Sequence, residues 1–165
     1  MNRLKKKILP ELNSIEWFDY VVSDKYKDWY NGPYEYNEIE LNWINNVIPS
    51  IISKDEKILD IGCGHGKWYD AFSKITRNYI GADTSKNMID IAKKKNPTGK
   101  WMHIKKDYTP SEKYDTIMEI WSLYVYPGGR ESFINKFSPH CNRILLFEGH
   151  GLGIQKGQKW EEIIC

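Results

Sequence analysis

Three glycines at alternate positions give this chain its clearest chemical signal. Gly62, Gly64 and Gly66 follow the apolar stretch at 58–61 within the segment KILDIGCGHG. Because glycine has no Cβ, such a loop accepts positive φ angles and lets its backbone amides come close to a ligand. A dinucleotide-binding loop has the spacing Gly-x-Gly-x-x-Gly, and here Lys67 stands at the third glycine position. The spacing therefore predicts a cofactor-binding loop and argues against NAD as the cofactor.

A carboxylate is expected beside this loop. The segment NYIGADTSKNMIDIAKKK predicts an apolar strand that ends at Asp83, then a helix that Ser85 caps and that runs to Lys95. Asp83 lies about twenty residues beyond the glycines, where an acidic side chain can accept two hydrogen bonds from a ribose diol. Asp83 alone could be an ordinary cap, so the loop and the carboxylate together indicate the site.

The remaining elements place polar residues at one edge of a sheet. We expect a strand at 58–61, a helix at 67–74, and three further strands at 100–109, 114–121 and 142–150. Upstream we expect a helix at 11–22 and a second one at 35–52 that Pro49 ends, with its apolar face at Ile39, Trp43, Val47 and Ile48. A short helix at 130–137 precedes the last strand. Open α/β sheets bind ligands in the crevice outside the carboxyl ends of their strands.

The stretch ILDIGCGHG resembles the first motif of the class I S-adenosylmethionine-dependent methyltransferases, and matching stretches follow in the family's order over about two-thirds of the chain. The resemblance implies a three-layer Rossmann-like α/β sandwich with a mostly parallel sheet. It also implies S-adenosylmethionine as cofactor and S-adenosylhomocysteine as product. Residues 1–52 would then form an N-terminal helical and aromatic lid with an edge helix, and 53–165 the cofactor-binding core.

The resemblance also assigns roles to individual residues. Asp83 would hold the ribose and Asp107 the adenine amino group, while Asp60 would orient the loop or touch the methionine amino group. Met88 would pack on the adenine face or fill the core, and Glu119 would hold the methionine end or an acceptor amine. The full set of implied cofactor-binding residues is Asp60, Gly62, Cys63, Gly64, Gly66, Asp83, Thr84, Met88, Asp107, Tyr108 and Glu119.

The end of the chain departs from the family's pattern. The family's sheet closes with an antiparallel hairpin of a sixth and a seventh strand, and the fifteen residues from Gly151 to Cys165 are too few for the usual helix and hairpin. We therefore expect a sheet that is abbreviated at its C-terminal edge. A bare edge beside the fifth strand favours pairing, so a homodimer, a partner subunit or a truncated pseudo-enzyme stays open.

The predicted reaction is in-line transfer of a methyl group to a hydroxyl or amine of a small molecule, with oxygen slightly favoured. The candidate catalytic residues are His150 and Glu148 as bases and Tyr124 as an acceptor-positioning group. Enzymes of the family that methylate amino groups of nucleobases or of protein glutamine commonly carry (Asp/Asn)-Pro-Pro-Tyr after the fourth strand. Here Glu119-Ile120-Trp121-Ser122 stands there instead, which argues against methylation of a base nitrogen. RNA or protein methylation and a noncatalytic cofactor-binding subunit remain the alternatives.

Composition excludes several other classes. The chain has 165 residues and a formal net charge of +2, which is too small to favour a nucleic-acid partner. It has 7 Trp and 11 Tyr, gathered in the N-terminal stretch and at 121–127, where aromatic faces suit a cationic sulfonium. Three cysteines and the lack of a signal peptide or apolar span predict a cytoplasmic protein without a membrane partner. We expect no metal, because the His and Cys residues lack ligand spacing.

Overall fold

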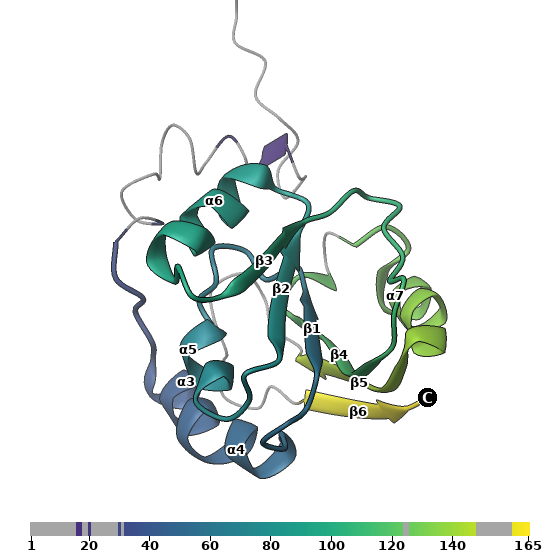
Figure 1. Ribbon diagram of the computed structural model, residues 1–165, viewed down its shortest axis with the longest axis horizontal. Helices are drawn as coiled ribbons and strands as arrows, with labels where there is room; N and C mark the ends of the chain where they lie inside the picture. Colours follow the sequence, from purple (N-terminus) through teal and green to yellow (C-terminus); the bar gives the residue numbers. More distant parts are fainter. Residues whose placement is uncertain (1–15, 18–19, 21–29, 31, 124–125, 148–159) are drawn as a thin grey trace, which may run out of the picture.

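In the computed structural model of the protein, the described residues are 16–17, 20, 30, 32–123, 126–147 and 160–165 (Figure 1). They form a sheet in the order β3-β2-β1-β4-β5-β6. The first five strands run parallel and β6 runs antiparallel to β5. This mixed α/β architecture confirms the predicted fold class. The strands are β1 (Ile58–Ile61), β2 (Tyr79–Asp83), β3 (Lys100–His103), β4 (Tyr114–Ile120), β5 (Cys141–Phe147) and β6 (Trp160–Ile164).

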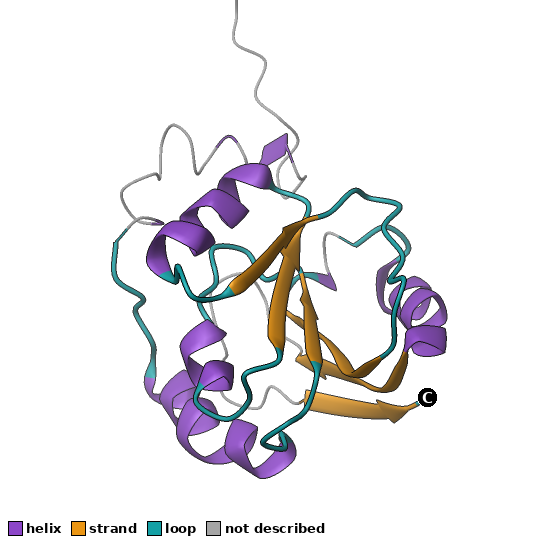
Figure 2. Ribbon diagram, viewed as in Figure 1, coloured by secondary structure: helices purple, strands orange, loops and turns teal. Residues whose placement is uncertain are grey.

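Helices cover both faces of the sheet (Figure 2). The core beneath α3, α4 and α5 includes Trp43, Ile48 and Phe72, and the core beneath α7 includes Phe133 and Phe137. The two short elements η1 and η3 are single turns of π-helix and 3-10 helix that continue α3 and α7. The helical elements are α3 (Glu38–Asn42), η1 (Trp43–Val47), α4 (Ile48–Ile51), α5 (Tyr69–Ser73), α6 (Lys86–Lys95), α7 (Gly129–Phe137) and η3 (Ser138–His140).

The alternation of side chains along β1 connects the two cores. Ile58 packs in the cluster with α3 to α5, while Leu59 and Ile61 pack in the cluster with α7. Ile58, Leu59 and Ile61 are all almost fully buried, as expected for a central parallel strand covered on both sides. The buried apolar run that precedes the glycine loop therefore places the start of that loop at the middle of the sheet.

Local sequence signals explain most of the helix ends. Ser85 caps α6, since its hydroxyl accepts a hydrogen bond from the Met88 amide, as predicted. The prediction that Pro49 ends the second helix is wrong. Pro49 is the second residue of α4, where the first turn needs no amide hydrogen, and the helix runs on to Ile51. The predicted apolar face is confirmed, because Trp43 and Ile48 are buried with Ile39 and Val47 packed against them.

The sequence predicted a sheet that stops at the fifth strand, but the sheet continues with a sixth strand. Trp160–Ile164 pairs antiparallel with β5, with Phe147 opposite Trp160 and Arg143 opposite Ile164. The edge of β5 that we expected to be bare is therefore covered by β6 from the same chain. The possibility that a second subunit pairs with that edge of β5 therefore loses its premise.

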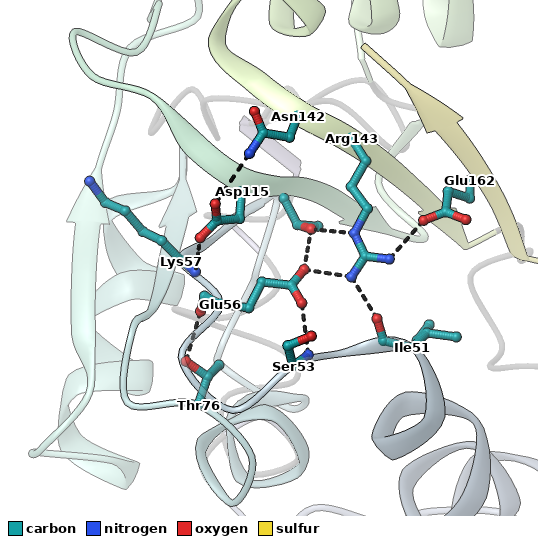
Figure 3. Close-up of polar contacts among 10 residues, drawn as sticks. Ile51, Ser53, Glu56, Lys57, Thr76, Asp115, Asn142, Arg143 and Glu162 are labelled. Atoms are coloured by element: carbon teal, nitrogen blue, oxygen red, sulfur yellow. Dashed lines mark hydrogen bonds and ion pairs between the residues drawn. The ribbon is translucent and has the colours of Figure 1, made fainter.

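A buried ion pair fastens β6 and the loop before β1 to the sheet (Figure 3). The Arg143 guanidinium lies 2.6 Å from Glu56 Oε1 and 2.7 Å from Glu162 Oε1, and it also donates to the Ile51 carbonyl oxygen. The Thr116 hydroxyl donates to Glu56 and accepts from Arg143. Arg143 of β5 thus ties together α4, the loop before β1, β4 and β6 at the end of the strands opposite the glycine loop.

No helix in the described part of the chain has the length and apolar character needed to cross a membrane.

Candidate functional site

A pocket opens at the carboxyl ends of the parallel strands. Ile61, Gly62 and Gly64 line it from the end of β1 and the glycine loop, while Asp83 and Thr84 line it from β2. The sheet order reverses between β1 and β4, so this is the switch point where open α/β sheets bind their ligands. The other lining residues are Ser85, Met88, Ile104, Lys105, Lys106, Tyr108, Trp121, Ser122, Tyr126, Pro127, Lys136 and Phe137.

The three glycines of the loop differ in what surrounds the position that a Cβ would occupy. All three have positive φ, at 81° for Gly62, 56° for Gly64 and 80° for Gly66. A Cβ on Gly62 would collide with the side chain of Ser122, whereas a Cβ on Gly64 would meet no atom within 4 Å. A Cβ on Gly66 would lie 2.7 Å from the Trp101 ring. Gly62 and Gly66 therefore make room for the side chains of Ser122 and Trp101, while Gly64 leaves open space; Gly62 and Gly64 line the pocket.

Asp83 joins the loop to the end of β2. Its Oδ2 accepts a 2.8 Å hydrogen bond from the Gly64 amide, and its Oδ1 accepts a 2.7 Å bond from the Ser85 amide. A carboxylate has about four lone-pair sites, more than these two bonds use. Asp83 thus braces the loop and lines the pocket at once.

Asp60 lies beneath the loop rather than on the pocket wall. It is 1% exposed, and its Oδ2 accepts a 2.5 Å hydrogen bond from the Tyr79 hydroxyl. Its Oδ1 is buried without a hydrogen-bond partner among the described residues. Burial raises the pKa of the Asp60 carboxyl to about 7, against the lowering effect of the Tyr79 hydrogen bond. This carboxylate is suited to receive a cation.

The other predicted cofactor residues divide between the pocket wall and its surroundings. Thr84, Met88 and Tyr108 line the pocket. Cys63 is buried, and burial raises the pKa of its thiol. Asp107 is exposed and is not among the pocket-lining residues, although its neighbours Lys106 and Tyr108 are. Its role on the adenine amino group stays a prediction.

Glu119 has an internal role in the structure. It is 1% exposed, and its Oε1 accepts hydrogen bonds from the amides of Ser122 and Leu123. These bonds hold the turn after β4, in which Trp121 has a φ of 64°, a region that residues other than glycine rarely adopt. Glu119 thus positions two pocket residues, Trp121 and Ser122, from below.

The predicted catalytic residues Tyr124, Glu148 and His150 lie outside the described residues. Their roles stay predictions. The aromatic stretch after β4 is described at Trp121 and Tyr126, and both line the pocket.

Several pocket residues were missed by sequence reasoning. Ser122 donates a 3.1 Å hydrogen bond to the Ile61 carbonyl oxygen and lies against Gly62. Ile104 follows β3 directly. Ligands bind just beyond strand ends, so a shorter predicted third strand would have indicated this residue. Lys136 and Phe137 come from the end of α7, and their approach depends on tertiary packing that no local pattern reveals.

The N-terminal segment lies against the other side of the glycine loop. The Tyr34 hydroxyl donates a 2.8 Å hydrogen bond to the His65 carbonyl oxygen, and the rings of Tyr30 and Tyr34 pack edge-on against the His65 ring. Burial, with the charges of Lys95 and Lys67, lowers the pKa of His65 to about 3, so its ring is neutral. Trp17, Tyr20 and Tyr30 pack against Met88 and Ile91 of α6.

A family model described as a methyltransferase domain matches residues 38–124, more than half of the chain. The ubiquinone biosynthesis O-methyltransferase of Pelagibacter ubique (strain HTCC1062) is 34% identical over 103 residues, which are 56% of this chain and 40% of that protein. The chain therefore spans well under half the length of this curated relative.

Solved structures with the same fold extend further along the chain. Magnesium protoporphyrin IX methyltransferase from Synechocystis PCC 6803, determined with bound S-adenosylmethionine, has a TM-score of 0.61 at 18% identity and covers 88% of this chain and 80% of its own. A TehB-like methyltransferase from Corynebacterium glutamicum has a TM-score of 0.57 at 22% identity, with 85% and 77% covered. At such identities these likenesses show a shared fold.

Proposed function

Since this chain belongs to the family of class I S-adenosylmethionine-dependent methyltransferases, we propose that it binds S-adenosylmethionine in the pocket at the strand ends and transfers the methyl group to a small molecule. The family membership follows from the domain model that matches residues 38–124. The observation that carries the proposal for this chain is the hydrogen bond between the Gly64 amide and Asp83, because it joins the predicted loop and the predicted carboxylate on one pocket wall.

The residues of the pocket fit the proposed cofactor. Open space lies where a Cβ of Gly64 would be, so a ligand can approach the loop backbone there. Asp83 would accept from the ribose hydroxyls, while Met88, Ile104 and Tyr108 offer apolar surface for the adenine. The buried Asp60 Oδ1 would receive the methionine ammonium group, directly or through a water. The cofactor supplies an electrophilic methyl group on a sulfonium.

The chain's own contribution to methyl transfer is to orient the acceptor and exclude water. Trp121, Tyr126 and Phe137 give the pocket a largely aromatic wall, and such faces favour a cation while they keep water out. Glu119 holds the turn that carries Trp121. Positioning of this kind supplies much of the rate in an in-line displacement.

A hydroxyl of a small molecule is the acceptor that we favour, with an amine as the second choice. The relative from Pelagibacter ubique is named as an O-methyltransferase of ubiquinone biosynthesis, which supports oxygen as the acceptor atom. His150 or Glu148 would then remove the hydroxyl proton, and Tyr124 would position the acceptor. The division into a lid and edge helix at 1–52 and a cofactor core at 53–165 belongs to the same proposal, supported by the contacts of Tyr34 with the glycine loop.

Isotope transfer tests the proposal directly. The purified chain is incubated with S-adenosylmethionine labelled in its methyl group and a cell extract that contains metabolites, RNA and protein, and the products are separated by size. Label in small organic molecules is the expected result. Label in RNA or protein would show that the acceptor is a macromolecule and not a small molecule. Tight cofactor binding without any transfer would show that the chain is a noncatalytic cofactor-binding subunit.

A further inference from the structure

Lys67, the residue that stands at the third glycine position of a dinucleotide loop, forms an ion pair with the buried Glu40 of α3. Its Nζ lies 2.7 Å from Glu40 Oε1, and Glu40 is 1% exposed. The second oxygen of Glu40 accepts a 3.0 Å hydrogen bond from the Asn37 amide and completes the capping box of α3. Both oxygens of the carboxylate are therefore committed, and the position of the Lys67 ammonium is fixed.

Three aromatic rings surround the same ammonium group. The distances from Lys67 Nζ to the ring centroids are 5.3 Å for Tyr36, 5.7 Å for Trp68 and 5.5 Å for Trp121. The Tyr36 hydroxyl donates a 2.5 Å hydrogen bond to the Lys67 carbonyl oxygen, which holds the cage to the loop. The ion pair and the ring contacts of Lys67 together hold the segment at 36–40 against the glycine loop.

Trp121 belongs both to this cage and to the wall of the cofactor pocket. Its ring contacts Trp68 edge-on, with centroids 5.4 Å apart, and Trp121 also lines the pocket. Its indole nitrogen is buried without a hydrogen-bond partner among the described residues. The orientation of this pocket wall therefore depends on packing and on the charge of Lys67.

We propose that Lys67 and Glu40 are positioning residues for the cofactor, which hold Trp121 against the pocket and cancel each other's charge beside the pocket wall. The inference rests on the proposed function. S-adenosylmethionine carries a positive sulfur, whereas the sulfur of S-adenosylhomocysteine is neutral. An unpaired Lys67 ammonium would repel the first ligand more than the second, and an unpaired Glu40 carboxylate would attract it.

Calorimetry with both ligands at low salt and pH 8 measures this charge effect. Glu40→Gln is expected to weaken S-adenosylmethionine relative to S-adenosylhomocysteine by about threefold to tenfold, and Lys67→Met to change the ratio in the opposite direction. The double variant has neither charge and is expected to return the ratio to that of the unmodified chain. Lys67→Arg keeps the cation and is expected to keep the ratio.

Matched controls come from the exposed pair at the other end of the strands. Lys57→Met and Glu112→Gln make the same changes of charge at a 2.7 Å ion pair remote from the glycine loop, and the ratio is expected to stay constant. If Glu40→Gln and Lys67→Met shift both affinities equally, or shift the ratio in the same direction, the pair is only structural and the inference is overturned. If the unmodified chain binds neither ligand, it is the proposed function that fails.

Discussion

The Gly64 amide and the Asp83 carboxylate form a 2.8 Å hydrogen bond that links the glycine loop after β1 to the end of β2. The two residues lie nineteen positions apart in the chain, and the parallel register of β1 and β2, with Ile61 opposite Ala82, brings them together. One carboxylate thus braces the loop and lines the pocket.

Asp83→Ala is expected to weaken S-adenosylhomocysteine binding by about 2 to 3 kcal/mol, or roughly 30-fold to 150-fold. The substitution removes the acceptor of the proposed ribose hydrogen bonds and releases the Gly64 amide. Isothermal calorimetry gives the affinity directly. Asp90→Ala on the exposed side of α6 is the control, and equal affinity for the two variants would contradict the role of Asp83.

Gly62→Ala and Gly64→Ala are expected to fail in different ways. Alanine at 62 would collide with Ser122 and lower the free energy of unfolding by more than about 1 kcal/mol, which is the cost of its positive φ alone. Alanine at 64 has open space, so it is expected to cost about 1 kcal/mol of stability but to block the cofactor. Urea unfolding and ligand calorimetry on both variants separate the two effects.

A second substitution checks the cause. Gly62→Ala combined with Ser122→Gly is expected to recover part of the lost stability, because the colliding side chain has been removed. Absence of any recovery would assign the whole cost to backbone strain.

Much of this site was predictable because its signals are local. The strand at 58–61, the cap at Ser85 and the end of β2 at Asp83 each follow from neighbouring residues, and parallel pairing brings their ends together without further information. The prediction at Pro49 was wrong because proline usually ends a helix, whereas in the first turn of α4 its missing amide hydrogen is not needed.

The features that sequence reasoning missed depend on contacts between distant segments. β6 reads WEEII and has two charged residues in a row, and it is held by pairing with β5 and by arginines on β5 and α7. Asp107 was placed at a strand end because the third strand was predicted to run to residue 109, whereas β3 ends at His103. Phe137 reaches the pocket only because α7 packs against β5.

Asp60 is expected to make stability depend on pH. Burial raises the pKa of its carboxyl from 3.8 to about 7, so between pH 4 and pH 7 the folded chain holds a proton that the unfolded chain has released. The free energy of unfolding due to this group is therefore fully present below about pH 4 and falls as the pH rises through 7. Urea unfolding of Asp60→Asn from pH 4.5 to 8 is expected to lack this fall.

Comparison with Asp90→Asn removes the effect of net charge, since Asp90 is an exposed partner of Lys86. The fall with rising pH should persist in Asp90→Asn. The same slope in all three proteins would show that Asp60 does not take up the proton.

Arg143→Met is expected to lower the free energy of unfolding by about 3 kcal/mol, because it leaves the Glu56 carboxylate, which is 8% exposed, without its counter-ion. The chain offers a matched control that also reaches β6. Arg130 lies 2.5 Å from Glu161, but both side chains are more than 40% exposed, so Arg130→Met is expected to cost less than about 1 kcal/mol. Urea unfolding measures both. If the two variants lost the same stability, burial would not distinguish the pairs, and the network around Arg143 would be only one more surface contact for β6.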